Sequence, residues 1–426
     1  MRTPVVAAVA ALLLIALPGL LLPLLDRSSC SEGNVEVACP TDPVGPDGTP
    51  VSDRFSFMHR PLGVHGSITA RVASMEGIIT YPPPGHDQIV PGLVPWAKAG
   101  VILKDGVTQG STYAALMLTG AHGVRMQHDY VHDTAGSATA RWLRLSRDGD
   151  VVTGEDSVDG VSWTRVGSVR LALPDTVLVG LFVTSPWDLT VRDGGSQMRF
   201  TQATGVFDHV VVDGPAASWT SATVGETGTT DWEKFHRAAG GVEADGTFTV
   251  TGTGDIGPLP GPSLAGVLVG LVLAVVVLVV WSVRWPFVVG VVGAGAAVVF
   301  VEGVHWLTVA RVVLGVGVFM ALVAAYSWAL RGLVRRWVAV AVALGTVVVP
   351  YVVALVVPGL EWLLRVTPAA GFSVVGTRVA YPQVVEYYAP AGGYFPLPWW
   401  AGLAVLGGYA AVLIGLRRVR TGTRTA

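Results

Sequence analysis

The chain has 426 residues, of which 51% are hydrophobic and only 14% charged, and its formal net charge is −2. Ordinary soluble domains carry roughly 25% charged residues, and the mean hydropathy of +0.56 indicates that much of this chain lies in lipid. Nucleic-acid binding needs a basic face, so the slightly negative charge argues against a nucleic-acid partner. We therefore expect a multi-domain membrane protein.

An apolar run of membrane-spanning length, Val5 to Leu25, opens the chain. No clear small-x-small cleavage site follows it, so residues 1–27 are interpreted as a first transmembrane helix and not as a cleaved signal peptide. Cys30 and Cys39 lie just beyond this helix. Because the exterior of the cell is oxidising, we expect a disulfide between them, with two free thiols as the alternative.

The next part of the chain, residues 28–261, is polar, rich in Gly, Asp and Thr, and alternates between apolar and polar positions. Turn signals recur at intervals of roughly 8–12 residues, and Asp148-Gly149 and Asp159-Gly160 are typical of tight hairpins. These patterns predict an all-β antiparallel sandwich over residues 28–213. A β-rich juxtamembrane segment, 214–261, is expected to follow it.

The rest of the chain is dominated by Val, Leu, Ala and Gly, with short breaks at charged residues or prolines. With the first run, these apolar segments predict an all-α transmembrane domain of six helices. A polar outer loop over 358–397 and a basic cytoplasmic tail over 417–426 complete this part. The five additional helices are expected at 262–283, 285–302, 307–330, 336–357 and 398–416.

Arginine placement predicts the orientation in the cell membrane, because loops rich in Lys and Arg stay in the cytoplasm. A six-helix count puts every arginine cluster on one side of the membrane. We therefore expect both termini in the cytoplasm and residues 28–261 outside the cell. The arginines that lie inside in this arrangement are Arg2, Arg284, Arg331, Arg335, Arg336 and those of the tail.

Two groups of segments resemble known families. WAKAGVILK, YAALMLTGAHGVRM, RWLRLSRDGD and EDSVDGVSWTRVG resemble the concanavalin-A-like jelly roll, a lectin-type sandwich. EWLLRVTPAAGFSV, YPQVVEYYAPAGGYFPL and PWWAGLAVLGGYAAVLIGL resemble the end of type-2, export-type ABC-transporter permeases, which place re-entrant or surface helices near the outer exit. The combination, with a sandwich inserted after the first helix, resembles a subgroup of bacterial permeases.

The resemblance implies a permease subunit that pairs with a second permease half and a separate ATPase to transport an unknown substrate. The chain has no ATPase motif of its own, and no enzyme activity or cofactor is expected. Related permeases dock the ATPase on a charged stretch between the second and third helices, which is reduced here to residues 282–286. The remaining candidates for ATPase docking are Arg284, Arg331, Arg335 and Arg336.

This departure keeps a second function open, in which transport has been lost. The chain is then a membrane-anchored module whose sandwich binds carbohydrate or another envelope polymer outside the cell. Trp96 and Trp163 are candidate sugar-stacking residues of such a module, although burial in the core is the favoured interpretation of both.

The stretch RMQHDYVHD places His128 and His132 four residues apart. On one strand they share a face, so both are candidates for a ligand-binding rim together with the two tryptophans. Zinc needs three or four ligands, and no HExxH or CxxC pattern completes a set. The favoured interpretation is therefore the polar end of a strand, with neither a metal nor a catalytic role.

The apolar segments contain few ionisable residues. Glu302 and His305 flank a short turn, and Arg311 follows in the next helix. The favoured interpretation is that these residues lie at the membrane interface, with Arg311 extended towards water or paired with Glu302. A polar gate is the alternative.

Overall fold

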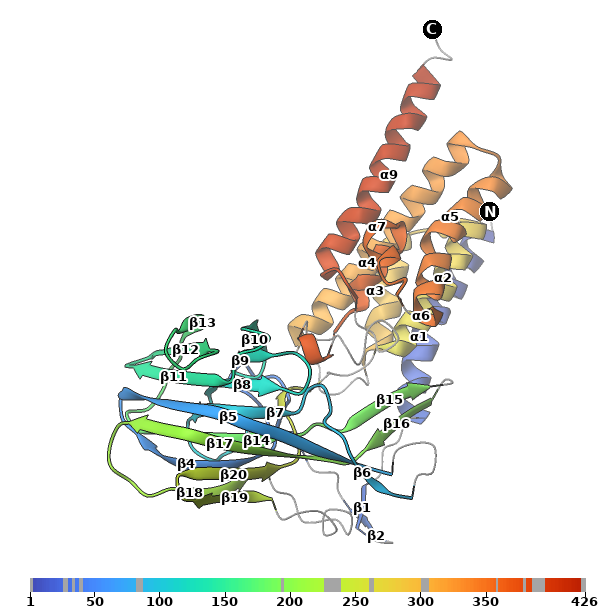
Figure 1. Ribbon diagram of the computed structural model, residues 1–426. Helices are drawn as coiled ribbons and strands as arrows, with labels where there is room; N and C mark the ends of the chain where they lie inside the picture. The colour runs from blue at the N-terminus through green and yellow to red at the C-terminus, as the bar shows by residue number, and fades with distance from the viewer. Residues whose placement is uncertain are drawn as a thin grey trace. The chain divides into compact units, whose positions relative to one another are not determined.

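The computed structural model forms two compact units, a β unit and a helical unit. The β unit comprises Pro40–Leu259 together with Tyr381–Gln383, and the helical unit takes the rest of the chain (Figure 1). The structure describes residues 3–25, 30–32, 35–37, 41–81, 87–192, 195–225, 239–259, 264–299, 306–357, 359–377, 381–384 and 395–422.

The β unit consists mainly of two large antiparallel sheets, which confirms the prediction of an antiparallel sandwich. The seven-stranded sheet has the order β10-β9-β8-β7-β14-β4-β18. Its strands are β4 (Phe55–Leu62), β7 (Lys98–Lys104), β8 (Tyr113–Thr119), β9 (Val124–His128), β10 (His132–Ala135), β14 (Val177–Thr184) and β18 (Thr220–Val224).

The eight-stranded sheet has the order β13-β12-β11-β5-β17-β20-β19, with the short strand β6 paired to β5. Its strands are β5 (His65–Thr80), β6 (Ile89–Pro91), β11 (Trp142–Asp148), β12 (Val151–Ser157), β13 (Thr164–Arg170), β17 (Thr201–Asp213), β19 (Gly240–Ala244) and β20 (Thr247–Gly252). Two two-stranded pairs accompany the large sheets: β3 (Val51–Asp53) with β21 (Ile256–Pro258), and β15 (Asp188–Arg192) with β16 (Gly195–Arg199). A further pair, β1 (Cys30–Glu32) with β2 (Val35–Val37), belongs to the helical unit.

Strands from the stretch 214–261 belong to both large sheets. β18 pairs with β4, and β20 pairs with β17. The stretch also supplies β21, which pairs with β3 close to where the β unit begins. The sandwich therefore includes chain on both sides of residue 213.

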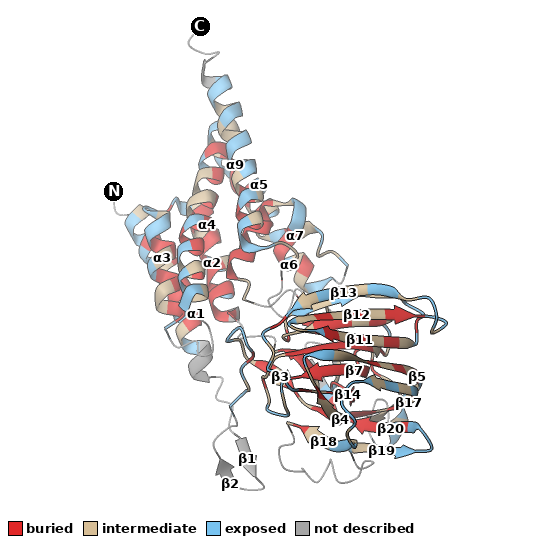
Figure 2. Ribbon diagram, turned by 90° about the vertical axis from the view of Figure 1, so that its left-hand side faces the viewer, coloured by how far each residue is buried: buried red, intermediate tan, exposed pale blue. Residues whose placement is uncertain are grey.

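The main core of the β unit consists of alternate residues from both sheets, as the period of two requires. β11 contributes Leu143 and Leu145, and β14 contributes Val179 and Leu181. A second apolar cluster includes Phe57 of β4 with neighbours from β7, β8, β14 and the β3–β21 pair. β7 is consequently buried at every position, which explains why its sequence is a nearly continuous apolar run. Figure 2 colours the buried residues red.

The described part of the helical unit contains α-helices and a 3-10 helix, η2. Its described elements are α1 (Thr3–Leu25), α2 (Ala265–Trp281), α3 (Pro286–Ala297), α4 (Trp306–Leu333), α5 (Arg336–Val347), α6 (Val349–Val356), α7 (Leu363–Val366), η2 (Pro368–Val375) and α9 (Trp399–Gly422).

The prediction of six membrane-spanning helices is wrong for the described part of the chain, where four helices are long and apolar enough. α2 and α3, expected at 262–283 and 285–302, are shorter than predicted. The 12 residues of α3 rise only about 18 Å, against a hydrocarbon core of about 30 Å. The four candidate spans are Pro4–Leu21, Trp306–Leu333, Arg336–Val356 and Trp399–Arg420. These helices indicate a membrane protein.

Glycines allow α1 and α2 to pack closely. Gly266 and Gly270 are four residues apart on α2, the small-xxx-small spacing of membrane helix contacts. A Cβ atom at Gly266 would lie 2.6 Å from the carbonyl oxygen of Pro18, and one at Gly270 would lie 2.3 Å from that of Leu14. The two backbones are therefore too close for any side chain at either glycine.

Candidate functional site

Two buried lysines define the polar side of the seven-stranded sheet. Lys98 and Lys104 stand at the two ends of β7, and both are 0% exposed. Their even spacing places them on one face of the strand, whereas Ala99, Val101 and Leu103 point into the main core. A buried ammonium group is costly unless it is paired and hydrogen-bonded, so the partners of each lysine define the site.

Lys104 pairs with Asp53 of β3, at a distance of 2.8 Å from Nζ to Oδ2. The same ammonium donates to the carbonyl oxygen of Ser111 at 3.0 Å and to the hydroxyl of Tyr130 at 2.9 Å. The Tyr130 hydroxyl and the backbone N–H of Gly110 also donate to Asp53 Oδ2, at 2.7 and 2.9 Å. Burial lowers the pKa of Lys104 and raises that of Tyr130, while the negative charge of Asp53 opposes the shift at the lysine.

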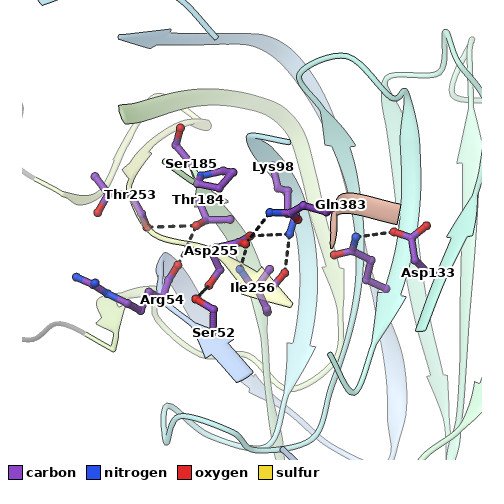
Figure 3. A network of polar contacts seen from close by, with 12 residues as sticks. Ser52, Arg54, Lys98, Asp133, Thr184, Ser185, Thr253, Asp255, Ile256 and Gln383 are labelled. Carbon is purple, nitrogen blue, oxygen red and sulfur yellow. Dashed lines mark hydrogen bonds and ion pairs between the residues drawn. The ribbon is translucent and has the colours of Figure 1, made fainter. Parts of the chain in front are cut away.

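Lys98 forms the second pair, with Asp255, the residue that precedes β21. Its Nζ donates to Asp255 Oδ1 at 2.8 Å and to the carbonyl oxygen of Ile256 at 2.5 Å. The other carboxylate oxygen, Oδ2, accepts from the side-chain amide of Gln383 at 2.7 Å. Figure 3 shows Lys98, Gln383 and Ser52 converging on Asp255. The pair therefore joins β7, the β3–β21 layer and a residue more than 120 positions further along the chain.

This polar site was not predicted from the sequence. WAKAGVILK contributed only to the family resemblance, although its two lysines flank an apolar run at an even spacing. That spacing is a usable signal, since two charges on one face of a fully apolar strand need buried partners. The partners Asp53 and Asp255 lie far away in sequence and show no local pattern.

The two candidate histidines lie on different strands, and the expected single strand is replaced by a hairpin. His128 ends β9, His132 begins β10, and the two residues are paired across the turn. Asp129 and Tyr130 adopt positive φ angles of 46° and 67°, which reverse the chain between them. The two imidazole rings stack with centroids 4.2 Å apart.

The hairpin holds no metal-binding set among the described residues, where no group of three His, Cys, Asp or Glu is close enough to hold an ion. Asp133 is committed to other partners, because it binds Arg125 and accepts from the Gln127 amide at 2.5 Å. Burial, and secondarily the charge of His132, lower the pKa of His128 to about 4. His128 is consequently neutral at physiological pH.

Acidification should destabilise the hairpin through His128. The pKa is about 4 in the folded protein and about 6.5 in an unfolded chain, so the unfolded state takes up a proton first as the pH falls. The contribution of the neutral His128 to the free energy of unfolding is complete above pH 6.5. It is lost as the pH falls from 6.5 to 4. His128→Asn should therefore lose less thermal stability than the wild type between pH 7 and pH 4.5. The same change at His65, whose side chain is 70% exposed, is the matched control and should leave the wild-type pH dependence intact.

The two candidate tryptophans have different surroundings. Trp96 is 2% exposed and stacks on His122 at a centroid distance of 4.1 Å. Trp163 follows the turn between β12 and β13, and the guanidinium of Arg144 lies 4.1 Å from its ring centroid. Trp96 therefore has no face open to a sugar, whereas Trp163 is only partly buried.

Two of the four arginines proposed for ATPase docking bind backbone carbonyls at the C-terminal end of α2. Arg331 donates to Ser282 and to the carbonyl of Val279, and Arg336 donates to the carbonyl of Val280 at 3.2 Å. Arg284 lies over the ring of Trp285 at 5.3 Å. Cations at a helix C-terminus satisfy its free carbonyls and favour its dipole. Arg331 and Arg336 therefore have a structural role at this end, whereas Arg335 is exposed.

Several predicted residues lie outside the described part of the chain. Cys30 is in β1, but Cys39 is not described, so the predicted disulfide stays a prediction. Glu302 and His305 are not described either. Arg311 is described, and its guanidinium donates to the carbonyls of Val374 and Gly376 at 3.2 and 2.7 Å.

No protein-family model and no curated protein matches this chain. Among solved structures, it is similar to a functionally unknown protein from Saccharomyces cerevisiae, with 15% identity over 45% of this chain and 94% of that one, and a TM-score of 0.22. A mutant of the GH43 protein BlXynB from Bacillus licheniformis is similar at 13% identity over 36% of this chain and 28% of that one, with a TM-score of 0.21. These weak likenesses assign neither a family nor a function.

Proposed function

We propose that this chain is the membrane subunit of an export-type ABC transporter, which works with a separate ATPase and a second permease half. In this proposal the β unit lies outside the cell and the helical unit forms half of the translocation path. The transported substrate is left open.

The observation that carries the proposal is the structure of the stretch between α6 and α9. α7 and η2 lie there, and all eight residues of η2 are buried within the helical unit. The ring of Phe372 packs against Phe319 of α4 and Tyr351 of α6, with centroid distances of 5.0 and 4.8 Å. Short interrupted helices enclosed by long ones are typical of transporters, because irregular backbone at membrane depth must be buried in protein or face a water-filled cavity.

Arg311 supports this interpretation. It lies in α4, and the two carbonyls to which it donates are at the C-terminal end of η2. Its guanidinium also lies 5.9 Å from the ring centroid of Trp399, the first residue of α9. An arginine in an apolar segment is costly unless it is bonded and is often functional. Here it ties α4, η2 and α9 together.

The expected orientation is compatible with four spans as well as with six. Four spans, like six, return the chain to the side from which it started. If only the four long helices cross, the loop that contains Arg335 lies on the same side as the tail, and the β unit lies opposite. The positive-inside rule then places the loop and both termini in the cytoplasm.

Affinity purification of the full chain from its native membrane tests the proposal, and the expected result is an ABC-type ATPase in stoichiometric amount. Arg335→Glu should weaken that association without preventing membrane insertion, since Arg335 is exposed and lies between two spans. Arg365→Glu, at an exposed arginine of α7 on the opposite side in this orientation, is the matched control. Recovery of the intact chain without any ATPase would refute the transporter proposal.

A second function, carbohydrate binding by an anchored module, is favoured by one feature of the eight-stranded sheet. Ser67, Ser146, Thr153 and Ser168 are paired in register across four neighbouring strands. These hydroxyls form a row on the sheet face that bears Arg144, two residues along β11. Hydroxyls both donate and accept hydrogen bonds, which suits a polysaccharide. Retention of the protein on envelope polysaccharide, without ATPase recovery, would support this alternative.

A further inference from the structure

Three residues from the stretch between η2 and α9 belong to the β unit. Tyr381–Gln383 groups with the sandwich, whereas the chain before Tyr381 and after Gln383 belongs to the helical unit. Tyr381 is 1% exposed and Gln383 is 7% exposed. We call these three residues the docked segment.

The docked segment is attached through the Lys98–Asp255 pair. The Gln383 amide donates to Asp255 Oδ2 at 2.7 Å, while Lys98 holds Oδ1 of the same carboxylate at 2.8 Å (Figure 3). The ring of Tyr381 covers Gly257 of β21, where an added Cβ would lie 3.5 Å from the ring. A hydrogen bond to a charged group and a ring contact are therefore among the interactions that hold the segment.

The attachment leaves hydrogen-bonding capacity unused on both sides. The Tyr381 hydroxyl and Gln383 Oε1 are buried and have no hydrogen-bond partner among the described residues. On the sheet, the same is true of the Tyr113 hydroxyl and Gln127 Oε1. Buried polar groups in a permanent core are nearly always bonded, and each unbonded group costs stability.

We propose that the docked segment is a reversible latch: Gln383 binds the Lys98–Asp255 pair in one state and leaves it in another. Release exposes a polar surface formed by Tyr113, Gln127 and Asp255. Because the docked segment lies in the chain between η2 and α9, the latch links the helical unit to the state of the sandwich. This inference deepens the proposed function, since a transporter must couple its outer domain to its helices, but its test does not depend on an ATPase.

Hydrogen–deuterium exchange of the full chain in lipid nanodiscs tests the latch, with Gln383→Glu as the main variant. A glutamate there meets Asp255 as a like charge in place of a hydrogen bond. At pH 7 the amides of Tyr381 and Gln383 should exchange at least about tenfold faster, as expected for the loss of a hydrogen bond to a charged group. Lowering the pH towards 4 protonates the glutamate and should restore much of the protection, after correction for intrinsic rates. Gln88→Glu, at an exposed glutamine, is the matched control and should change nothing.

The pattern of exchange decides between the latch and other roles. Faster exchange in residues 381–384 and in η2, with β7 unchanged, supports a latch coupled to the helical unit. Faster exchange throughout β7 and β14 means that Gln383 is a permanent part of the sandwich core, and the proposal fails. Faster exchange confined to residues 381–384 removes the coupling, and unchanged exchange everywhere removes the latch. Loss of ATPase recovery with an intact latch pattern would refute only the proposed function.

Discussion

Replacing Asp53 by asparagine is expected to lower the free energy of unfolding of the β unit by about 3–5 kcal/mol, the usual cost of breaking a buried ion pair on one side. Asp53 and Lys104 both have fully buried side chains, 0% exposed, and their charged atoms lie 2.8 Å apart. The substitution leaves the Lys104 ammonium without a charged partner. Denaturant unfolding of the full chain in micelles, followed by tryptophan fluorescence, measures the change.

Two further variants test whether the loss of stability comes from the buried ion pair. Asp148→Asn makes the same substitution at a pair with His65 whose side chains are 88% and 70% exposed, and it should cost at most about 1 kcal/mol. Asp53→Asn combined with Lys104→Met removes both charges, so it should cost less than the sum of the single variants. Additive effects would mean that the two groups do not interact, contrary to their geometry.

The sequence predicted the sandwich because alternation and turn signals are local properties. Leu143 and Leu145 alternate with the polar residues of β11, and Asp148-Gly149 forms the hairpin to β12. The β3–β21 layer could not be predicted in this way. Its two strands have three residues each and come from opposite ends of the β unit, so their pairing has no local signature.

The histidine motif contains a turn where a single strand was expected, although His128 does end a strand. If His128 and His132 lay four residues apart on one strand, their side chains would share a face of that strand. The structure instead pairs them across a hairpin, since Asp129 and Tyr130 adopt left-handed backbone conformations. Aspartate tolerates this region better than most residues, whereas tyrosine rarely adopts it. Tyr130 occupies it while its hydroxyl is bound to Asp53, so a distant contact accompanies the local turn.

Hydropathy alone overestimated the number of spans because it measures composition and not helix length. The segment 285–302 is apolar throughout most of its length, yet α3 ends at Ala297. The predicted helix 336–357 divides into α5 and α6 around Val348, two residues before Pro350, but it still forms one candidate span. Proline removes a backbone donor and disfavours helical continuation, which explains the break. Which helices cross the membrane also depends on packing between helices, which hydropathy patterns do not encode.

Replacing Gly270 by alanine is expected to destabilise the helical unit by about 1–3 kcal/mol or more, the usual range for overpacking. The added methyl carbon would lie 2.3 Å from the Leu14 carbonyl oxygen, so α1 and α2 must separate. Backbone atoms cannot rotate away as a flexible side chain can. Gly266→Ala, with a clash at 2.6 Å, should act in the same direction. Thermal unfolding in detergent micelles measures both variants.

Gly345 supplies the matched control, because it lies within α5 and a Cβ there would have no atom within 4 Å. In the absence of a clash, Gly→Ala in a helix stabilises by roughly 0.5–1 kcal/mol, since alanine loses less backbone entropy on folding. Glycine-to-alanine substitution should therefore lower stability at Gly270 and raise it at Gly345. A stabilising effect at Gly270 would show that α1 and α2 are not in close contact, and the glycine pair on α2 would then have no packing role.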